Sequence, residues 1–466
     1  MSDLDVTRVR RAVGPIIAEV DVPPSKSIAN RAVVCAALAD GESTIRGVAP
    51  GDDTEAMTDC LGALGIPVGI ERDGASLVGT IMGTGGDLPV GPIALPTRLA
   101  GTTSRFITAM AALGPGPYTV DGDPPLRSRP MEPLHNSLHA LGVRVEPGEA
   151  WGHLPVTVSG PVTGNHADGL VMPGDVSSQY VTALMLIAPL IPGGISFGLS
   201  TSLVSRPYVE ITERVMAAFG ATEVSVGDRL ISVGSGAYSP TDYTVEPDAS
   251  SASYPLAAAA IVGGAVSVKG LGRNSMQGDA RFCDVLEQMG CLVTVGPTDT
   301  VVMRRRDTPL RGIDIDMADI SDLVPTMAVV ATQATTPTRI TGVGFIRGKE
   351  SDRLGDLATE LNKLGANVVV DPDGITITPT DLLHGARVTT HHDHRLAMSF
   401  GLLGLVVDSV EIESPSVVSK SWPAYWDALD AMLSRGAGAQ RRRRKGGGVG
   451  VGEAGGGGQG GGADEA

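Results

Sequence analysis

The feature that most constrains how this chain folds is a repeat that recurs six times along it. Each copy opens with a short Ser-, Thr- or Asp-rich segment and continues into an apolar helix of small residues. The copies begin roughly every 71–76 residues, a spacing typical of one supersecondary unit used repeatedly. The six openings are Ser25-Lys26-Ser27, Gly101-Thr102-Thr103, Ser177-Ser178, Ser250-Ser251, Ser321-Asp322 and Asp393-His394.

A second helix follows within the copies and closes on an apolar residue and a glycine. Such ends occur at 61–65, 138–142, 215–220, 286–290 and 361–365. A glycine in this position favours a left-handed C-cap. A β-type run follows each of these helices, and another strand lies between the two helices of a copy. The unit therefore reads β-α-β-α-β-β.

Six units divide into two sets of three, which predicts an α/β protein with one domain at 22–246 and another at 247–433. A solenoid is the alternative architecture for six repeats. It is disfavoured because the units are long and mixed α/β, and because their polar motifs gather at the N-terminus of the first helix. If those N-termini meet in one cleft, six helix ends that favour anions face one another.

The composition narrows the classes of partner. A net charge of −16 argues against non-specific binding to nucleic acid or to an anionic membrane, because both need a basic face. No apolar run reaches about 18 residues and no signal sequence is evident, so a cytoplasmic protein is expected. The four cysteines form no CxxC pair and are expected to be buried apolar residues.

The tail at 435–466 differs in composition from the rest of the chain. A basic run at 441–445 leads into a Gly-rich stretch that cannot bury enough apolar surface to fold. We expect a disordered, solvated Arg/Gly-rich tail, and a segment that binds nucleic acid or a partner is the alternative.

Basic side chains lie in or beside the repeat openings. Lys26 and Arg31 stand near hydroxyls at the start of a helix, which suits phosphate or carboxylate, although an ordinary helix cap fits as well. Gly101 would let backbone N–H groups approach a ligand closely. The cations placed in this way are Lys26, Arg31, Arg105, Arg129, Lys349, Arg353, Arg395 and Lys420. So many cations repel one another unless anions lie between them, which predicts a cleft for two anionic substrates.

Hydroxyl and amide side chains accompany the cations. Ser177, Ser178 and Gln179 would suit a polyol or a phosphate, and Ser205 begins a second helix. A Gly-flanked polar octet at 272–279 is too distinctive for mere surface, though it could be a structural loop.

Acidic residues and histidines cluster in the last two copies. Asp322 lies at an expected helix start, and Glu350 belongs to a second charged cluster. His392 and His394 raise the question of a metal. In an extended segment they would point to opposite sides, and no partner motif such as HExxH is present, so no metal site is expected.

Seven motifs occur in one order along the chain: PSKSxxNR, AGTxxR, SSQ, DASSASY, GRNSMQGD, KExDRL and DHR. With these motifs, between about residues 10 and 430, the sequence resembles the EPSP synthase family. The resemblance implies an inside-out α/β barrel fold in which two pseudo-threefold domains each contain three βαβαββ repeats. It also implies that the N-terminal strand joins the second domain, which then comprises 1–21 plus 247–433. The domains of such enzymes close over their substrates and exclude water.

The resemblance implies an enzyme that transfers the enolpyruvyl (1-carboxyvinyl) group of phosphoenolpyruvate to the 5-hydroxyl of shikimate-3-phosphate. The reaction is an addition followed by an elimination, releases phosphate, and serves the shikimate pathway to chorismate and the aromatic amino acids. Such a transferase needs neither a metal nor an organic cofactor. It works as a monomer on small molecules, without nucleic acid or membrane.

The family's ligand contacts fall on residues of this sequence. Those implied for shikimate-3-phosphate are Lys26, Ser27, Arg31, Ser177, Ser178, Ser205, Asp322 and Lys349. Those implied for phosphoenolpyruvate are Lys26, Gly101, Arg129, Gln179, Arg353, Arg395 and Lys420. By the same resemblance Asp322 is the base at the hydroxyl, Glu350 is the acid at C3, and Lys26 stabilises charge and can carry a proton. His394 is implied as a participant behind the substrates.

The sequence departs from the family pattern at three positions. Leu99 and Phe106 stand where many members have Asn and Pro, and Phe345 replaces an Asn that contacts the shikimate ligand. These positions flank the two substrate pockets and leave the reaction class intact. Gly101 is retained, which leaves room for glyphosate, so sensitivity to that inhibitor is predicted.

Three rival functions fit the sequence less well. UDP-N-acetylglucosamine enolpyruvyltransferase shares the fold and the donor, but it uses Lys-Asn where this chain has Lys26-Ser27. It also usually carries a reactive loop cysteine, whereas Cys35 and Cys60 lie in expected helices. An RNA 3′-phosphate cyclase-like protein is disfavoured by the acidic body and the lack of aromatic stacking platforms. A catalytically inactive regulator is disfavoured because, apart from the position of Phe345, the expected ligands, acids and bases are present.

Overall fold

The computed structural model describes residues 5–73, 76–162 and 169–434 of the 466-residue chain. The Arg/Gly-rich tail predicted at 435–466 therefore lies outside the described residues. In the part of the chain that is described, no helix is both long and apolar enough to cross a membrane. Short strands and helices alternate throughout, so the protein is mixed α/β.

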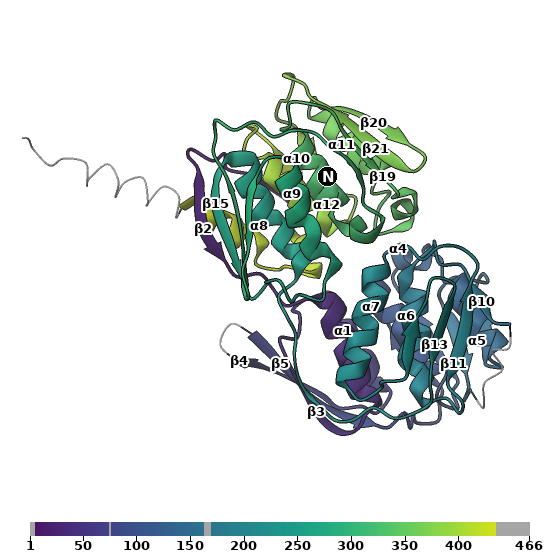
Figure 1. Cartoon of the computed structure of the whole chain (residues 1–466). Coiled ribbons are helices and arrows are strands. Elements are labelled where there is room, and N and C mark those ends of the chain that lie inside the picture. The colour runs from purple at the N-terminus through teal and green to yellow at the C-terminus, as the bar shows by residue number, and fades with distance from the viewer. Residues whose placement is uncertain (1–4, 74–75, 163–168, 435–466) are drawn as a thin grey trace, which may run out of the picture.

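Two separate hydrophobic cores organise the molecule. The first draws its buried residues from the segment 28–245, and the second draws them from the segments 9–20 and 249–432. Figure 1 shows the chain folded into two lobes, with β2 (Ile16–Val20) beside β15 (Gly264–Lys269) in the upper one. The N-terminal segment thus packs with the second half of the chain.

The predicted β-α-β-α-β-β unit is seen complete in the second copy, and this prediction is confirmed. Its elements are β6 (Ile93–Pro96), α3 (Gly101–Ala111), β7 (Tyr118–Asp121), α4 (Pro124–Arg127), α5 (Glu132–Ala140), β8 (Arg144–Pro147) and β9 (Val156–Ser159), where α4 is a single extra turn. The sheet has the order β6-β7-β9-β8. β6 and β7 are parallel, and the other neighbours are antiparallel.

The same strand order recurs in the third and fifth copies. The elements of the third are β10 (Val171–Met172), α6 (Ser178–Ile187), β11 (Ile195–Leu199), α7 (Arg206–Ala218), β12 (Val224–Val226) and β13 (Leu230–Val233). Those of the fifth are β18 (Asp314–Asp316), α10 (Val324–Ala331), β19 (Thr338–Thr341), α11 (Gly355–Lys363), β20 (Asn367–Asp371) and β21 (Gly374–Thr378).

The first and fourth copies each take one strand from a distant part of the chain. The first contains α1 (Lys26–Leu38), β3 (Asp40–Arg46), α2 (Asp52–Ala63), β4 (Val68–Asp73) and β5 (Ser76–Thr84). Its remaining strand is β14 (Asp242–Thr244), which runs parallel to β3. The fourth contains α8 (Ala249–Val262), β15, α9 (Phe282–Gln288), β16 (Leu292–Val295) and β17 (Asp299–Arg304). It takes β2 in the same parallel arrangement.

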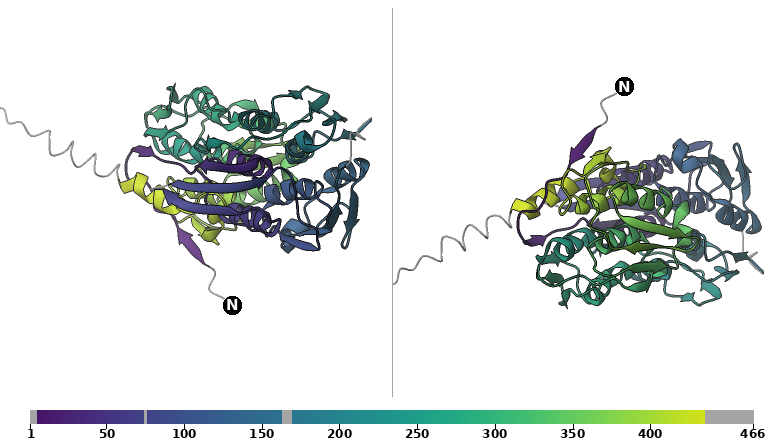
Figure 2. Two further views of the ribbon diagram at one scale, coloured as in Figure 1. Left: turned by 90° about the horizontal axis from the view of Figure 1, so that it is seen from below. Right: turned by 90° about the horizontal axis from the view of Figure 1, so that it is seen from above.

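The sixth copy is closed by the N-terminus. It contains β22 (Arg387–Val388), α12 (His394–Leu403) and β23 (Glu411–Glu413). β1 (Val6–Arg8) pairs antiparallel with β23 to complete a three-stranded sheet. Both views of Figure 2 show β1 beside the yellow C-terminal part of the described chain.

The chain crosses between the lobes at two places that lie side by side. The Ser25 N–H donates to the Glu246 carbonyl at 2.9 Å, and the Asp248 N–H donates to the Pro23 carbonyl at 2.8 Å. These bonds join the segment that leaves β2 to the segment that leaves β14.

We propose that these crossings separate two domains. One would span 22–246 and the other 1–21 plus 247–433. The proposal is supported by the two cores, because each draws its buried residues from one of these ranges.

The first helix of a copy is buried on nearly every side. All residues of α8 and of α10 are buried, which small and apolar residues permit because a helix that is apolar all round must be surrounded by protein. The second helices are amphipathic, and α7 and α11 bury one face. The first helices are thereby held in the interior of each lobe.

Two further expectations are confirmed. The glycines that follow the second helices all have left-handed φ, which is 83° at Gly142 and 82° at Gly365. The four cysteines are free and buried.

Candidate active site

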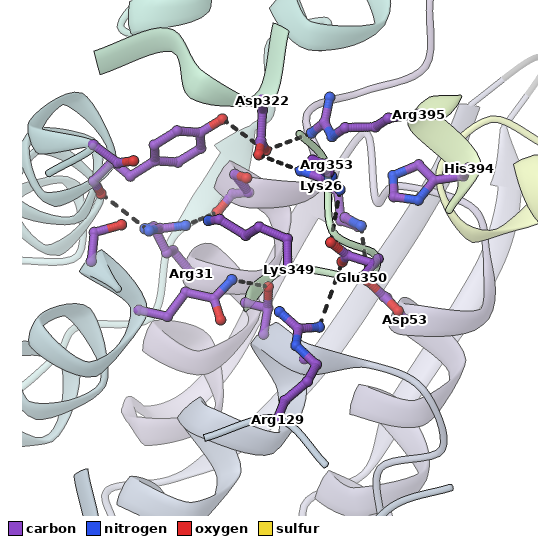
Figure 3. A pocket seen from close by; sticks show the side chains of 17 residues that line it. Lys26, Arg31, Asp53, Arg129, Asp322, Lys349, Glu350, Arg353, His394 and Arg395 are labelled. Carbon is purple, nitrogen blue, oxygen red and sulfur yellow. Dashed lines mark hydrogen bonds and ion pairs between the residues drawn. The ribbon is translucent and has the colours of Figure 1, made fainter. Parts of the chain in front are cut away.

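A cavity between the two lobes collects the N-termini of several first helices (Figure 3). Lys26 begins α1, Gly101 begins α3, Ser178 begins α6 and His394 begins α12, and all four line the cavity. Asp322, just before α10, lines it as well. The predicted convergence of helix N-termini is therefore found here for five copies, while the start of α8 lines a smaller cavity nearby.

All the predicted site residues lie in or beside this cavity. Those that line it are Lys26, Ser27, Arg31, Gly101, Arg129, Ser178, Gln179, Ser205, Asp322, Lys349, Glu350, Arg353, His394 and Arg395. Ser177 caps α6 by accepting a hydrogen bond from the Gln179 N–H at 3.3 Å, and it lines an adjacent cavity. Lys420 Nζ lies 3.3 Å from Glu350 Oε1.

Three residues that the sequence analysis did not select also line the cavity: Asp53, Thr102 and Tyr208. Thr102 Oγ1 accepts a hydrogen bond from Gln179 Nε2 at 3.2 Å. Asp53 lies in the first turn of α2 and Tyr208 in the first turn of α7. The repeat could have indicated Asp53 and Tyr208, because the second helices of the first and third copies also begin at the cavity.

Arg353 is the centre of a network of buried charges. Its side chain is 2% exposed, and its guanidinium lies 2.8 Å from Asp322, 2.7 Å from Glu350 and 2.7 Å from Asp393. Asp393 is fully buried and caps α12 by accepting from the Arg395 N–H at 2.8 Å. Burial disfavours the charged guanidinium, yet the three carboxylates outweigh it and hold the pKa of Arg353 above its ordinary value. Arg353 thus holds the carboxylates of all three acidic residues in place.

Glu350 lies where cations from both lobes meet. Besides Arg353, its carboxylate is 3.3 Å from Lys420 Nζ. It is also 3.6 Å from Arg129 Nη1 (Figure 3). Burial alone would raise the pKa of Glu350, but Lys420, Arg353 and Arg129 outweigh it and hold the pKa well below its ordinary value. Glu350 is therefore an anion that links Arg129 of the first lobe to the second lobe.

Asp322 and His394 both lose their ordinary tendency to hold a proton. The two oxygens of Asp322 accept from Arg353 at 2.8 Å and from Arg395 at 2.7 Å. Burial raises the pKa of Asp322, yet the charges of Arg395 and Arg353 outweigh it and lower the pKa below its ordinary value. For His394, burial and then the charge of Lys26 lower the pKa well below its ordinary value. Asp322 is thus an anion, and His394 is a neutral imidazole.

Arg31 is a buried cation without an acidic partner among the described residues. Its guanidinium donates to Thr212 Oγ1 at 2.8 Å and to the carbonyls of Ser27 at 2.6 Å and Tyr208 at 3.1 Å. It also lies 5.5 Å from the centre of the Phe106 ring. Burial lowers the pKa of Arg31 to about 10, so the side chain stays charged at neutral pH. A positive charge held by neutral groups is suited to an anionic ligand.

Lys26 is paired with an acid that belongs to the same cavity. Its Nζ lies 2.8 Å from Asp53 Oδ2, and the Asp53 side chain is 4% exposed. Thr103 Oγ1 donates to the Asp53 carbonyl at 3.1 Å, so α2 and α3 together fix this acid. The ammonium of Lys26 is thereby held at the cavity wall.

Gly101 leaves space for two guanidinium groups. A Cβ at this position would lie 2.6 Å from Arg129 Nη1 and 3.1 Å from Arg105 Nη1. Arg105 donates to the carbonyls of Gly101 at 3.0 Å and Pro130 at 3.1 Å, and burial lowers its pKa to about 10. The absence of a side chain at Gly101 therefore preserves the position of Arg129.

The three positions that depart from the expected pattern have distinct surroundings. The ring of Phe345 lines the adjacent cavity, and its centre is 5.6 Å from Lys349 Nζ. Phe106 is buried, and the Leu99 carbonyl accepts from Lys420 Nζ at 3.3 Å. Phe345 thus gives Lys349 a cation–π contact where an amide was expected.

The segment before α12 is not extended, which corrects one expectation. His391 and His392 both have left-handed φ, of 50° and 58°, and His392 is exposed. His394 is buried at the start of the helix. A turn of the backbone separates His392 from His394, rather than the alternation of a strand.

The cavity carries an excess of positive charge. Six lysine and arginine side chains line it against three carboxylates, which leaves three positive charges unbalanced. The cations are Lys26, Arg31, Arg129, Lys349, Arg353 and Arg395, and the carboxylates are Asp53, Asp322 and Glu350. Such a site suits ligands that carry several phosphate or carboxylate groups.

Comparisons with known proteins agree on one family. The chain matches the model of the family described as EPSP synthase (3-phosphoshikimate 1-carboxyvinyltransferase) over residues 11–429. A 3-phosphoshikimate 1-carboxyvinyltransferase of Nostoc punctiforme is 40% identical over 438 residues, which cover 93% of this chain and 100% of the relative. The Methanosphaerula palustris relative of the same name is 42% identical over 422 residues, covering 90% and 97%. The solved EPSP synthase from Acinetobacter baumannii has a TM-score of 0.75 at 26% identity and covers 92% of this chain and 98% of that one.

Proposed function

The chain belongs to the EPSP synthase family, and on this basis we propose how its cavity carries out the family's reaction. The enzyme transfers the carboxyvinyl group of phosphoenolpyruvate to the 5-hydroxyl of shikimate-3-phosphate and releases phosphate, a step of the shikimate pathway to the aromatic amino acids. The observation that supports our assignment of residues is the excess of cations around Asp322 and Glu350.

Each substrate brings a phosphate and a carboxylate, so together they offset the positive charge of the cavity. To phosphoenolpyruvate we assign Lys26, Gly101, Arg129, Gln179, Arg353, Arg395 and Lys420. To shikimate-3-phosphate we assign Lys26, Ser27, Arg31, Ser177, Ser178, Ser205, Asp322 and Lys349. Arg31 supports the second set, because neutral groups hold its charge and leave it open to an anion.

Glu350 shares its cations with the donor substrate. When the anionic groups of phosphoenolpyruvate bind Arg129 and Lys420, they take up part of the positive charge that stabilises the Glu350 carboxylate. The pKa of Glu350 then rises from its low value, and the carboxyl group can gain a proton. Binding of phosphoenolpyruvate thus favours the protonated form of Glu350, which can then donate a proton to C3.

The chemistry needs proton transfers at two places. Asp322 takes the proton of the 5-hydroxyl as that oxygen attacks C2 of phosphoenolpyruvate, and Glu350 gives a proton to C3. In the tetrahedral intermediate that results, C2 carries both oxygens. The bond from C2 to the phosphate oxygen then breaks as C3 returns a proton to the Glu350 carboxylate, which restores the double bond and releases phosphate. Lys26 stabilises the developing charge and can carry a proton, with neutral His394 behind it.

Phosphate release from the purified enzyme tests this assignment. We expect release when phosphoenolpyruvate is supplied with shikimate-3-phosphate, and none above background when UDP-N-acetylglucosamine replaces that acceptor. The rival enolpyruvyltransferase has Lys-Asn where this chain has Lys26-Ser27. Release with the nucleotide sugar alone, or with neither acceptor, would overturn the proposal.

Asp53→Asn tests whether the pairing with Lys26 matters for catalysis. The amide keeps the shape of the side chain but loses the charge-assisted hydrogen bond of 2.8 Å. Such a bond contributes about 1.5–3 kcal/mol, so we expect kcat/KM for phosphoenolpyruvate to fall about 10- to 100-fold in steady-state assays. Asp52→Asn is the matched control, since Asp52 is exposed and does not line the cavity. Equal kinetics in the two variants would mean that other contacts hold Lys26.

We further propose that the enzyme works in the cytoplasm as a monomer. Its cysteines are free and buried, which suits a reducing compartment. The monomer is what the resemblance to the family implies. Sensitivity to glyphosate stays a prediction from Gly101, which leaves space beside Arg129.

A further inference from the structure

The hydroxyl of Tyr208 lies between two carboxylates of the other lobe. Tyr208 belongs to the first turn of α7, and its Oη lies 3.1 Å from Asp279 Oδ2 and 3.4 Å from Asp322 Oδ2. A phenol carries a single proton, so it donates to one of these carboxylates at a time. The three side chains form a continuous path for hydrogen bonds from the cavity wall to Asp279.

Asp279 ends the polar octet at 272–279, none of whose residues lines the main cavity. Its side chain lies in the short helix η2 (Gly278–Arg281) and is 4% exposed. Oδ2 also accepts a hydrogen bond from Ser250 Oγ, whereas Oδ1 is buried without a partner among the described residues. A buried carboxylate oxygen that lacks a donor disfavours the charged form, so this carboxyl group readily takes up a proton.

The charges that face Asp279 come from several elements. Asp248, the N-cap of α8, and Asp322 are negative, Arg395 of α12 is positive, and Tyr208 of α7 supplies a hydroxyl. Burial, followed by the charge of Asp322, raises the pKa of Asp279 to about 6. Asp279 therefore exchanges a proton near neutral pH. Asp322, which two arginines stabilise as an anion, retains a proton poorly.

We propose that Asp279 is a positioning residue which accepts, through Tyr208, the proton that Asp322 takes from the 5-hydroxyl of shikimate-3-phosphate. The O5–H bond breaks as the O5–C2 bond forms, and the hydroxyl proton moves to Asp322 Oδ2. Asp322 gives a proton to Tyr208 Oη while Tyr208 gives its own to Asp279 Oδ2. Asp322 is then an anion again, Tyr208 is again a phenol, and Asp279 is neutral. When the C2–O bond to phosphate breaks, the proton returns through Tyr208 to Asp322 and leaves on the departing phosphate oxygen.

The inference rests on the proposed role of Asp322 as the base. It explains how Asp322, whose lowered pKa makes it a weak base, can still take the proton of the 5-hydroxyl. It also gives the octet a function. Gln277 Nε2 donates to Glu246 Oε1 at 2.9 Å and to the Pro247 carbonyl at 2.7 Å, at a crossing between the lobes. The octet thereby fixes Asp279 relative to the first lobe, from which the phenol comes.

Asp279→Asn distinguishes proton transfer from a structural role. The amide oxygen accepts the same hydrogen bonds from Tyr208 and Ser250, but it takes up no proton. We expect kcat to fall about 10-fold. Asp279 must be an anion to accept the proton, so activity of the unmodified enzyme falls as pH drops through about 6. The phosphate of the substrate also titrates near pH 6. As pH falls, kcat/KM for shikimate-3-phosphate should therefore decrease with the uptake of two protons in the unmodified enzyme, one by Asp279 and one by the phosphate. In Asp279→Asn it should decrease with the uptake of one proton.

Two further variants complete the experiment. Asp319→Asn is the matched control, because the Asp319 side chain is 46% exposed and pairs with Arg281 of η2 at 3.2 Å. This variant should keep the rate and the profile. Tyr208→Phe keeps the ring, removes the hydroxyl and should show the one-proton profile, even if Asp279→Asn does not fold. If Asp322→Asn is inactive but both Asp279→Asn and Tyr208→Phe keep the two-proton profile, the inference is overturned. An active Asp322→Asn would instead overturn the proposed base.

Discussion

Asp322→Asn should lower kcat by about 10²–10⁴-fold without raising KM for phosphoenolpyruvate. The amide has the size of the carboxylate and can still accept from Arg353 or Arg395, which now lie 2.8 Å and 2.7 Å away. It cannot take the proton of the 5-hydroxyl, so the chemical step slows. It also no longer competes as an anion for the two arginines, so the donor binds at least as well. Steady-state phosphate release, with each substrate varied in turn, separates the two effects.

The control for this result is Asp319→Asn, because Asp319 lies on the same short helix, η3 (Ala318–Leu323), and its side chain is 46% exposed. It should retain the kinetics of the unmodified enzyme. A rate near that of the unmodified enzyme in Asp322→Asn would remove Asp322 as the base. An equal loss in both variants would show that the helix, rather than the carboxylate, was responsible.

Arg353→Met should destabilise the fold more than any other single change in the site. Methionine replaces most of the buried volume but leaves Asp393, whose side chain is fully buried, without its cation. Removing one partner of a buried ion pair costs about 3–5 kcal/mol, because the remaining charge stays buried and unpaired. The midpoint of urea unfolding, followed by circular dichroism, measures the loss.

Arg347→Met is the matched control for the loss of stability. Arg347 pairs with Asp352 at 3.0 Å, but both side chains are about a third exposed or more, at 35% and 40%. Solvent-exposed pairs of this kind contribute no more than about 1 kcal/mol. Similar losses in Arg353→Met and Arg347→Met would contradict the central place of Arg353.

The same network should make stability depend on acid pH. In the folded protein the pKa values of Asp322 and Glu350 lie below the ordinary 3.8 and 4.5. Each carboxylate therefore stabilises the folded state at pH values above its ordinary pKa. That stabilisation is lost as pH falls through the lower values of the folded state, because the unfolded chain binds the protons first. The unmodified enzyme should therefore lose stability steadily below about pH 4.5, and Arg353→Met should do so less steeply.

Much of the fold followed from the repeat. Each copy has to bury the same kind of apolar helix, so spacing alone indicated the order of helices and strands. The left-handed glycines, such as Gly142 and Gly365, followed from the need to end each second helix at a fixed point. The motifs then indicated the family, which the comparisons confirm.

Which charges pair with which did not follow from the sequence. Arg353 reaches Asp322 and Asp393 across 31 and 40 residues of chain, and no local pattern specifies such contacts. Tyr208 was missed because its partners lie in the other lobe, so its role depends on how the lobes meet. The turn at His391 likewise depends on a distant residue, Glu360, whose carboxylate lies 3.3 Å from its ring.

The strand that the second lobe takes from the N-terminus imposes an order on folding during synthesis. β2 leaves the ribosome more than 240 residues before its partner β15. At roughly 5–20 residues per second the first lobe, including β14, can assemble while β2 waits unpaired for tens of seconds. A waiting strand is open to wrong partners, and the charge of Glu19 within β2 disfavours them. A change in β2 would therefore act on the second lobe, most of whose strands are translated after the first lobe.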